Sequence, residues 1–323
     1  MKILFYNVEN LFDTLDDPFV NDQAFLPDSV LKWDEKRYLL KLQRLAKVIR
    51  SVEEPMPMAI GLAEVENRKV LEDLIAALEL SEKEIGIIHE ESPDERGIDV
   101  GFLYRRGPIQ GTEHKTYPVI FSNDPGDKTR DILHVKSVLK SGEILHFFIN
   151  HWPSRKDGVN ITLPKRMQAA SVLQHHIEEV FKEEKDPKIL VMGDFNAGPE
   201  SPAIKNILDR DRSPNGLLHN LSWNAHKSGL GSLNYRGKWL LFDQILASPS
   251  LLDEQEDCRI IPDSFSIFKK DWMLFYNQKY HDFRPNKTYG GRKYHAGFSD
   301  HLPVYISLIM GTSKTNRKPL QLF

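Results

Sequence analysis

The stretch KILVMGDFN, residues 188–196, joins an apolar run to a polar end. Its first half, from Ile189 to Met192, is a short continuous apolar run of the kind found in buried strands. Asp194 and Asn196 follow directly after it. The stretch therefore predicts a buried strand that leads into a loop and carries two polar side chains at its end.

Near the end of the chain, polar residues come before an apolar run instead of after it. GFSDHLPVYI, residues 297–306, places Asp300 and His301 before an apolar run that begins at Val304. Proline is tolerated at the first residue of a strand, so Pro303 can open this one. We expect the Asp-His pair to lie at the mouth of the strand and not inside the core.

Further strand and helix candidates are spread along the whole chain. Strands are predicted at residues 2–8, 58–65, 98–105 and 240–248, and residues 132–152 read as two antiparallel strands joined at 141–142. Helices are predicted at residues 33–52, at 67–80 with Asn67 as N-cap, and at 163–181 with Pro164 where the helix begins. Strands interspersed with amphipathic helices favour a single α/β or α+β domain over residues 1–323.

Polar side chains recur where the other strand candidates end. Asn7 and Glu9 follow the first strand, Glu64 the second and His151 a later one, and Asp243 lies within LLFDQIL. One buried carboxylate is most often a structural residue, so the prediction depends on the whole set. Such a set suits attack of water on a phosphorus centre.

The residue types assign a role to each part of that chemistry. Glu64, Asn7 and Glu9 offer hard oxygen ligands, which suit Mg²⁺ or Mn²⁺ better than zinc. Asp194, positioned by Asn196, can accept a proton from the attacking water. A second group completes the set: His301 can donate hydrogen bonds to phosphoryl oxygens, and Asp243 can hold its ring and favour its protonated form.

Seven blocks in order resemble the endonuclease/exonuclease/phosphatase superfamily. They are FYNVENLFD, GLAEVEN, GIDVGFLYRR, NHWPSR, VMGDFNAGPES, LLFDQILAS and GFSDHLPV, and they span residues 5–304. The resemblance implies an α+β fold of the DNase I-like type. This fold is a four-layer α/β/β/α sandwich of two mostly antiparallel sheets with helices outside.

The resemblance also implies functions for individual residues. It implies that Asn7, Glu64 and Asp300 bind the metal ion. Glu9, at a position where some members have aspartate, is a further candidate. It also implies five catalytic residues. His151 would lie beside the scissile phosphate, Asp194 and Asn196 would handle the nucleophilic water, and Asp243 would pair with His301. The cofactor implied is Mg²⁺ or Mn²⁺.

Composition limits the partners and the compartment. The net charge of -3 gives no overall attraction to a polyanion, so nucleic acid would have to meet a local basic patch. Cys258 is the single cysteine, which excludes an intramolecular disulfide. The first residues do not resemble a secretory leader and no apolar run is long enough to span a bilayer. We expect a cytoplasmic monomer, or an exported one if a leader had been removed.

Two basic segments are candidates for substrate binding. Arg155 follows His151 into a loop and can grip a phosphate with two hydrogen bonds, although a solvated loop arginine fits the sequence equally well. Residues 268–298 interleave aromatic side chains with Lys279, Arg284 and Lys293, a mixture that can stack bases and hold phosphates. The same residues can also form a long loop that packs its own aromatic rings.

The sequence therefore predicts a phosphodiester hydrolase that depends on a divalent metal and acts as an endonuclease on DNA or RNA. The alternative enzyme is a phosphomonoesterase or a phospholipid-type phosphodiesterase, of the inositol phosphate or sphingomyelin class, with the same site. A non-catalytic binding module on the same scaffold is a third hypothesis. Such a module should lack some of the four residues Glu64, Asp194, Asn196 and His301, and all four are present.

Overall fold

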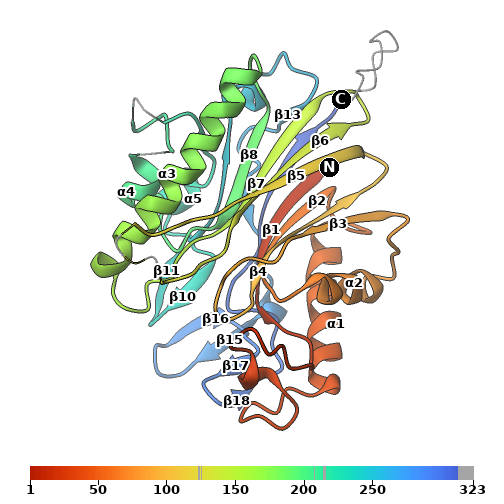
Figure 1. Cartoon of the computed structure of the whole chain (residues 1–323), viewed down its shortest axis with the longest axis vertical. Helices are drawn as coiled ribbons and strands as arrows, with labels where there is room; N and C mark the ends of the chain where they lie inside the picture. The colour runs from red at the N-terminus through yellow and green to blue at the C-terminus, as the bar shows by residue number, and fades with distance from the viewer. Residues whose placement is uncertain (123, 125, 207, 214–215, 312–323) are drawn as a thin grey trace.

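Two β-sheets packed face to face form the centre of the molecule, as a computed structural model shows (Figure 1). The structure describes residues 1–122, 124, 126–206, 208–213 and 216–311. Sheet 1 has the strand order β13 (Arg259–Ile260), β19 (Val304–Ile309), β1 (Lys2–Leu11), β2 (Ala59–Val65), β4 (Asp99–Arg105) and β3 (Ile85–His89), with β14 (Ser266–Ile267) also paired to β19. Sheet 2 has the order β5 (Ile109–Tyr117), β6 (Ile132–Leu139), β7 (Ile144–His151), β8 (Ile189–Asp194), β12 (Asp243–Ala247) and β9 (His219–Asn220).

Strand pairing in both sheets is mostly antiparallel. Sheet 1 has one parallel pair, β1 with β2, and sheet 2 has one, β7 with β8. The buried faces of the two sheets meet in an apolar core, where the rings of Phe102 and Phe147 lie 4.8 Å apart. The sheets approach so closely that a Cβ on Gly61 would lie 2.8 Å from Met192 Sδ, which explains the glycine in β2.

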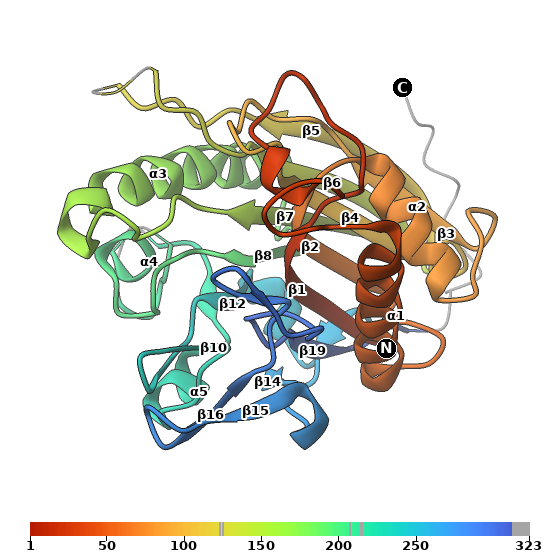
Figure 2. The same cartoon turned by 90° about the horizontal axis from the view of Figure 1, so that it is seen from below.

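Helices cover the outer faces of the two sheets and complete four layers (Figure 2). The helices α1 (Glu35–Val52) and α2 (Arg68–Ala77) pack on sheet 1, and α3 (Val159–Glu183) packs on sheet 2. Two short helices, α4 (Pro202–Lys205) and α5 (Trp223–Lys227), and 3₁₀ turns at Gln23–Phe25, Pro249–Leu252 and Asp271–Met273 complete the helical elements of the described residues. The predicted α+β, α/β/β/α fold is confirmed.

Local sequence signals explain the starts of α1 and α2 but not that of α3. The side chain of Asp34 accepts a hydrogen bond from Arg37 N, and that of Asn67 accepts one from Val70 N, as expected for N-caps. The expected start of α3 at Pro164 is wrong, because the helix begins at Val159 and holds Pro164 inside it. The earlier turn is stabilised by the Thr162 hydroxyl, which donates to the carbonyl of Gly158 at 2.7 Å.

Three small hairpins lie beyond the two sheets. They are β10 (Leu233–Tyr235) with β11 (Lys238–Leu240), β15 (Leu274–Asn277) with β16 (Asp282–Pro285), and β17 (Tyr289–Gly290) with β18 (Lys293–Tyr294). Figure 1 shows them at the end of the molecule where β1 finishes. No helix among the described residues is long and apolar enough to cross a membrane.

Candidate active site

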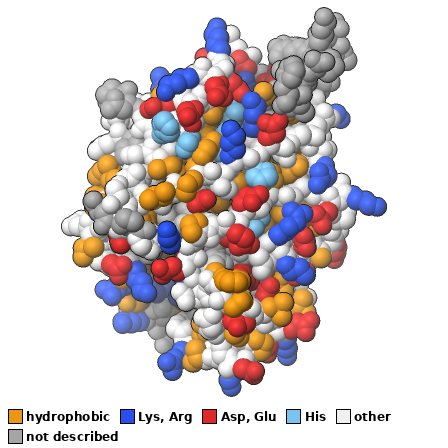
Figure 3. Space-filling view, viewed as in Figure 1, with side chains coloured by type: hydrophobic (Ala, Val, Ile, Leu, Met, Phe, Trp, Pro, Cys, Tyr) orange, Lys and Arg blue, Asp and Glu red, His pale blue; other side chains and the backbone are white. Residues whose placement is uncertain are grey.

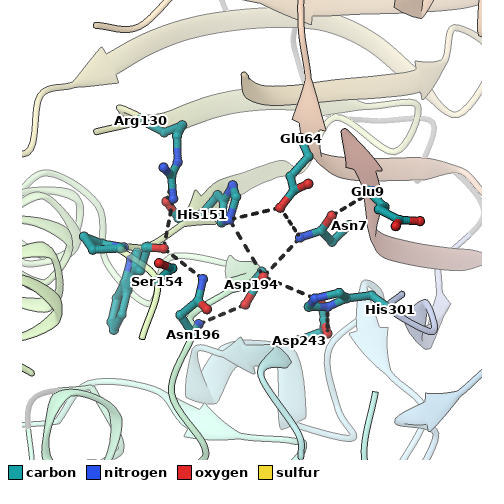
Figure 4. Close-up of polar contacts among 12 residues, drawn as sticks. Asn7, Glu9, Glu64, Arg130, His151, Ser154, Asp194, Asn196, Asp243 and His301 are labelled. Carbon is teal, nitrogen blue, oxygen red and sulfur yellow. Dashed lines mark hydrogen bonds and ion pairs between the residues drawn. The ribbon is translucent and has the colours of Figure 1, made fainter. Parts of the chain in front are cut away.

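The ends of six strands bring most of the predicted polar side chains into one cluster (Figure 4). Strand register explains part of this arrangement, because His151 on β7 and Asp243 on β12 both pair with Asp194 on β8. β1 contributes Asn7 and β2 contributes Glu64. His301 comes from the turn just before β19, which begins at Val304 as the proline before it predicts.

Irregular backbone at the ends of β1 and β2 aims the side chains from sheet 1. The pairing register shifts after Asn7 in β1, and in β2 between Ala63 and Val65, on either side of Glu64. Glu64 has a φ of 65° and Glu9 a φ of 55°, values that are uncommon for residues other than glycine. Bulges and left-handed residues of this kind concentrate at functional sites, where they redirect a side chain.

The Asp194 carboxylate lies at the centre of the cluster with its two oxygens in different roles. Oδ1 accepts a hydrogen bond from Asn196 N at 2.9 Å, and Oδ2 accepts one from Asn7 Nδ2 at 3.1 Å. Burial raises the pKa of Asp194 to about 6, partly offset by the positive charge of His301. The carboxylate is therefore ionised above this value and poised to take up a proton close to neutral pH.

Two imidazole rings point their Nε2 atoms at the same oxygen. His151 Nε2 and His301 Nε2 each lie 3.8 Å from Asp194 Oδ2, and His151 Nε2 also lies 3.8 Å from Glu64 Oε1. These separations are too long for direct hydrogen bonds. Both rings therefore keep Nε2 available for a group that binds between them and the carboxylate.

His301 is held as an imidazolium by a second carboxylate. Its Nδ1 donates to Asp243 Oδ2 at 2.7 Å, and the hydroxyl of Ser232 donates to the same oxygen. Burial lowers the pKa of His301, but the charges of Asp243 and Asp194 outweigh it and raise the pKa well above its usual range. Asp194, Asp243 and His301 are close enough to share a metal ion, yet a doubly protonated ring has no lone pair to offer one.

His151 has the opposite protonation state. Burial, with the nearby charges of Arg130 and Arg96, lowers its pKa well below the usual range, so the ring is neutral. Arg130 donates to the carbonyls of His151 and Trp152, at 3.2 and 3.0 Å, and pairs with Asp94 at 2.7 Å. Sequence reasoning missed Arg130 and Asp94, because neither belongs to a strand end with a polar pattern.

The predicted metal residues occupy three kinds of position. Glu64 faces the cluster, with Oε2 accepting from Asn10 N and Oε1 lying 3.3 Å from Asn7 Nδ2. Asn7 presents its amide nitrogen to Glu64 and Asp194, while its oxygen accepts from Glu9 N, so here it bridges two carboxylates.

Glu9 points away from this bridge, as Figure 4 shows, and accepts a hydrogen bond from Thr288 N. Its side chain is also 3.8 Å from Lys41 Nζ. Burial and the charge of Asp300 raise the pKa of Glu9 to about 7.

The predicted substrate-binding residues lie outside the cluster. Arg155 Nε donates to the carbonyl of Asn196 at 2.6 Å, and its guanidinium lies 4.3 Å from the Phe242 ring centre. Arg155 is thus joined to the loop that carries Asn196. Lys279, Arg284 and Lys293 lie in residues 274–294, the hairpin region, which contains the β15–β16 and β17–β18 hairpins. Among the described residues, none of the three forms a hydrogen bond or ion pair with the cluster.

The chain was compared with known proteins by sequence and by structure. A family model described as the endonuclease/exonuclease/phosphatase family matches residues 2–310. The chain belongs to this family. A sequence search of curated proteins finds no match.

Solved structures similar to this member of the family agree on the fold. A Bacteroides thetaiotaomicron protein described as a member of the same family is 14% identical with a TM-score of 0.58, covering 97% of this chain and 98% of that one. Truncated TDP2 from Caenorhabditis elegans is 13% identical with a TM-score of 0.57, covering 95% and 97%. A mannosyl-6-phosphatase from Bacteroides thetaiotaomicron is 15% identical with a TM-score of 0.59, covering 96% and 100%.

Membership of the endonuclease/exonuclease/phosphatase family sets the general class of activity. The family consists of phosphoester hydrolases and nucleases, which commonly use divalent metal ions. This family member carries acidic side chains that could bind such an ion. The class of chemistry is therefore phosphoester hydrolysis.

Proposed function

We propose that this protein is a divalent-metal-dependent phosphodiester hydrolase that cuts nucleic acid, DNA or RNA, internally. The observation that carries the proposal is the convergence of two histidine Nε2 atoms on Asp194 Oδ2, each at 3.8 Å. The three groups frame a position where a water and a phosphoryl oxygen can bind together. A carboxylate and two imidazoles in this arrangement supply both proton transfer and stabilisation of charge on phosphorus.

The proton steps follow from the protonation states of the three groups. Asp194 takes the proton of the attacking water on Oδ2, because its other oxygen is held by Asn196 N. His301 donates a hydrogen bond from Nε2 to the phosphoryl group and keeps its proton, and Asp243 stabilises the positive charge of the ring. His151 is neutral, so it does not repel the charged ring of His301. In the tautomer that carries its single ring proton on Nε2, His151 can also donate a hydrogen bond to the phosphoryl group.

Glu64 is the residue we assign first to the metal, with Asn7 and Asp300 beside it. Carboxylate oxygens are ligands that Mg²⁺ and Mn²⁺ prefer. The amide oxygen of Asn7 accepts from Glu9 N in this structure, so the Asn7 amide would have to turn to add an oxygen ligand. Among the described residues, no Lys or Arg forms an ion pair with Glu64, so its charge is free to bind a cation. When bound, the ion neutralises phosphate charge and stabilises the leaving oxygen.

Replacing Glu64 with Gln is expected to raise the metal concentration needed for half-maximal activity by about 10-fold or more, since loss of a supporting contact alone costs about 10–100-fold in affinity. Titration of Mg²⁺ and Mn²⁺ against the initial rate measures this. The control is Glu72→Gln, an i,i+4 partner of Arg68 on α2, which should titrate as the wild type does. An unchanged metal dependence in Glu64→Gln would place the ion elsewhere.

The hairpin region supports nucleic acid as the substrate. Tyr276 and Phe283 are both exposed on paired strands of one hairpin, with ring centres 5.3 Å apart. Lys279 and Arg284 each lie against the ring of Tyr280 in the same hairpin. Exposed rings with cationic side chains can stack bases and hold phosphates. On the face shown in Figure 3, Lys and Arg are scattered among acidic side chains, so attraction has to be local.

Changing Lys279, Arg284 and Lys293 together to Gln is expected to weaken nucleic-acid binding and to lower its salt slope by about 2, since each phosphate contact contributes about 0.7–0.9. Fluorescence anisotropy across a salt series, with a labelled oligonucleotide and no added metal, measures the slope. Lys140, Lys182 and Lys185, exposed near the opposite end of sheet 2, form the matched control triple. If the two triple variants show the same affinity and the same salt slope, the hairpin region does not bind nucleic acid.

Product analysis on defined substrates tests the proposed function itself. The panel contains single- and double-stranded DNA and RNA oligonucleotides, a sugar phosphomonoester, an inositol polyphosphate and sphingomyelin vesicles. We expect internal cleavage of an oligonucleotide, abolished by chelator. Fast release of phosphate from a monoester with intact oligonucleotides would instead support the phosphomonoesterase alternative.

A further inference from the structure

A second group of ligand-type side chains lies where β3 passes into β4. His89 ends β3, Asp99 begins β4, and Glu91 lies in the loop between them. One donor atom from each residue lies within 4.8 Å of the donors of the other two. None of the three belongs to the cluster around Asp194.

Two of the donors are buried without a hydrogen-bond partner. His89 Nε2 and Asp99 Oδ2 lie 3.7 Å apart, in side chains that are 3% and 2% exposed. Neither atom is paired with a nitrogen or hydroxyl donor among the described residues, and the carboxyl groups of Glu91 and Asp99 lie close enough to interact with each other. The other oxygen of Asp99 is occupied, because it accepts from the backbone N of Ser92 at 3.1 Å and from its hydroxyl. Burying an imidazole nitrogen and a carboxylate oxygen unpaired is unfavourable unless something binds between them.

We propose that His89, Glu91 and Asp99 bind a divalent first-row transition metal ion, separate from the metal of the catalytic cluster. One imidazole with two carboxylates favours such an ion over Mg²⁺. Donors bound at about 2.0–2.2 Å in tetrahedral geometry lie about 3.4 Å apart, so small side-chain movements close the 3.7 Å gap. Glu91 is 68% exposed and has a donor atom within 4.8 Å of donors of the other two residues, so it can reach the ion from the solvent side.

The position of this site links it to the catalytic histidine. The loop that it closes, residues 90–98, carries Asp94, which pairs with Arg130 at 2.7 Å. Arg130 in turn donates to the backbone carbonyl of His151. An ion at His89, Glu91 and Asp99 fixes both ends of the loop. It therefore limits movement of Asp94 and of the contacts that Asp94 and Arg130 make toward His151. Asp94 and Arg130 act as positioning residues.

Equilibrium dialysis against Zn²⁺, chosen because it binds such donors tightly, tests the site. The test variant is Glu91→Gln, whose exposed side chain can change without disturbing the core. The matched control is Glu90→Gln, the neighbouring glutamate, which pairs with His114 Nε2 at 2.8 Å instead. We expect one Zn²⁺ to bind about 10-fold or more weakly in Glu91→Gln and unchanged in Glu90→Gln.

A third variant separates this site from the proposed catalytic metal. Glu64→Gln should retain the Zn²⁺ that Glu91→Gln loses, even if the proposed catalytic metal site proves wrong. Hydrogen–deuterium exchange provides a readout other than activity: Zn²⁺ should slow exchange of residues 90–98 in the wild type and in Glu90→Gln, but not in Glu91→Gln. Equal Zn²⁺ binding in Glu91→Gln and the wild type, or no slowing of exchange in the wild type, would overturn the proposal.

Discussion

Asp194→Asn is expected to lower kcat by about 10²–10⁴-fold, the usual contribution of a positioned general base. Asn has the same shape, and its side-chain oxygen can still accept from Asn196 N, so the variant loses the proton acceptor and the hydrogen bond from Asn7 Nδ2 while the side chain keeps its place. KM should change little, because the carboxylate is assigned to the water and not to substrate binding. Steady-state kinetics at saturating metal measures both constants.

The folded state should tolerate this substitution. Burial raises the pKa of Asp194 to about 6, above its value in an unfolded chain, so the ionised carboxylate destabilises the fold at pH 8. Removing it should leave Tm unchanged or higher. Glu200→Gln, on the loop after the same strand, is the control and should keep full activity. Full activity in Asp194→Asn would exclude Asp194 as the base.

His301→Gln is expected to lower kcat/KM by a similar factor, about 10²–10⁴-fold, because a charged donor to the phosphoryl group is lost. Gln keeps a neutral donor but no positive charge. The control is His175→Gln, an exposed histidine on α3, which should leave the rate unchanged. Retention of wild-type kinetics in His301→Gln would remove the histidine from the mechanism.

Asp243→Asn tests the same pair through its pH dependence. Asp243 helps to raise the pKa of His301, so without this carboxylate the ring loses its proton at a lower pH. The alkaline limb of the kcat/KM profile should therefore move to lower pH, together with a loss of rate. A limb that stays in place would show that Asp243 does not set the protonation of His301.

Much of the fold and of the cluster could be predicted because both depend on local sequence. The run before Asp194 predicts β8, and Pro303 correctly predicts where β19 begins. The two sheets pack face to face, so polar residues placed at the ends of their strands, either just before or just after them, can meet at one edge. The structure brings together His151, Asp194, Asp243 and His301 in this way.

Other features depend on contacts between distant segments and carried no local signal. Arg130 supports His151 from a loop 21 residues earlier, and Asp94 reaches Arg130 across 36 residues. The side-chain direction of Asn7 also depends on the bulge after it, so its amide nitrogen faces the carboxylates. The strands β3 and β5 were not predicted. Because His89 lies at the end of β3, its proximity to Asp99 was not predicted either.

The central claim is that the Asp194 cluster hydrolyses phosphodiesters with a bound metal ion. Nicking of supercoiled plasmid DNA tests it most directly, with Mg²⁺, with Mn²⁺ and with chelator, and with Asp194→Asn purified in parallel to reveal contaminating nuclease. We expect nicking by the wild type that needs metal and disappears in the variant. Equal nicking by wild type and variant would exclude Asp194 from the reaction, and absence of nicking with either metal would exclude DNA as the substrate.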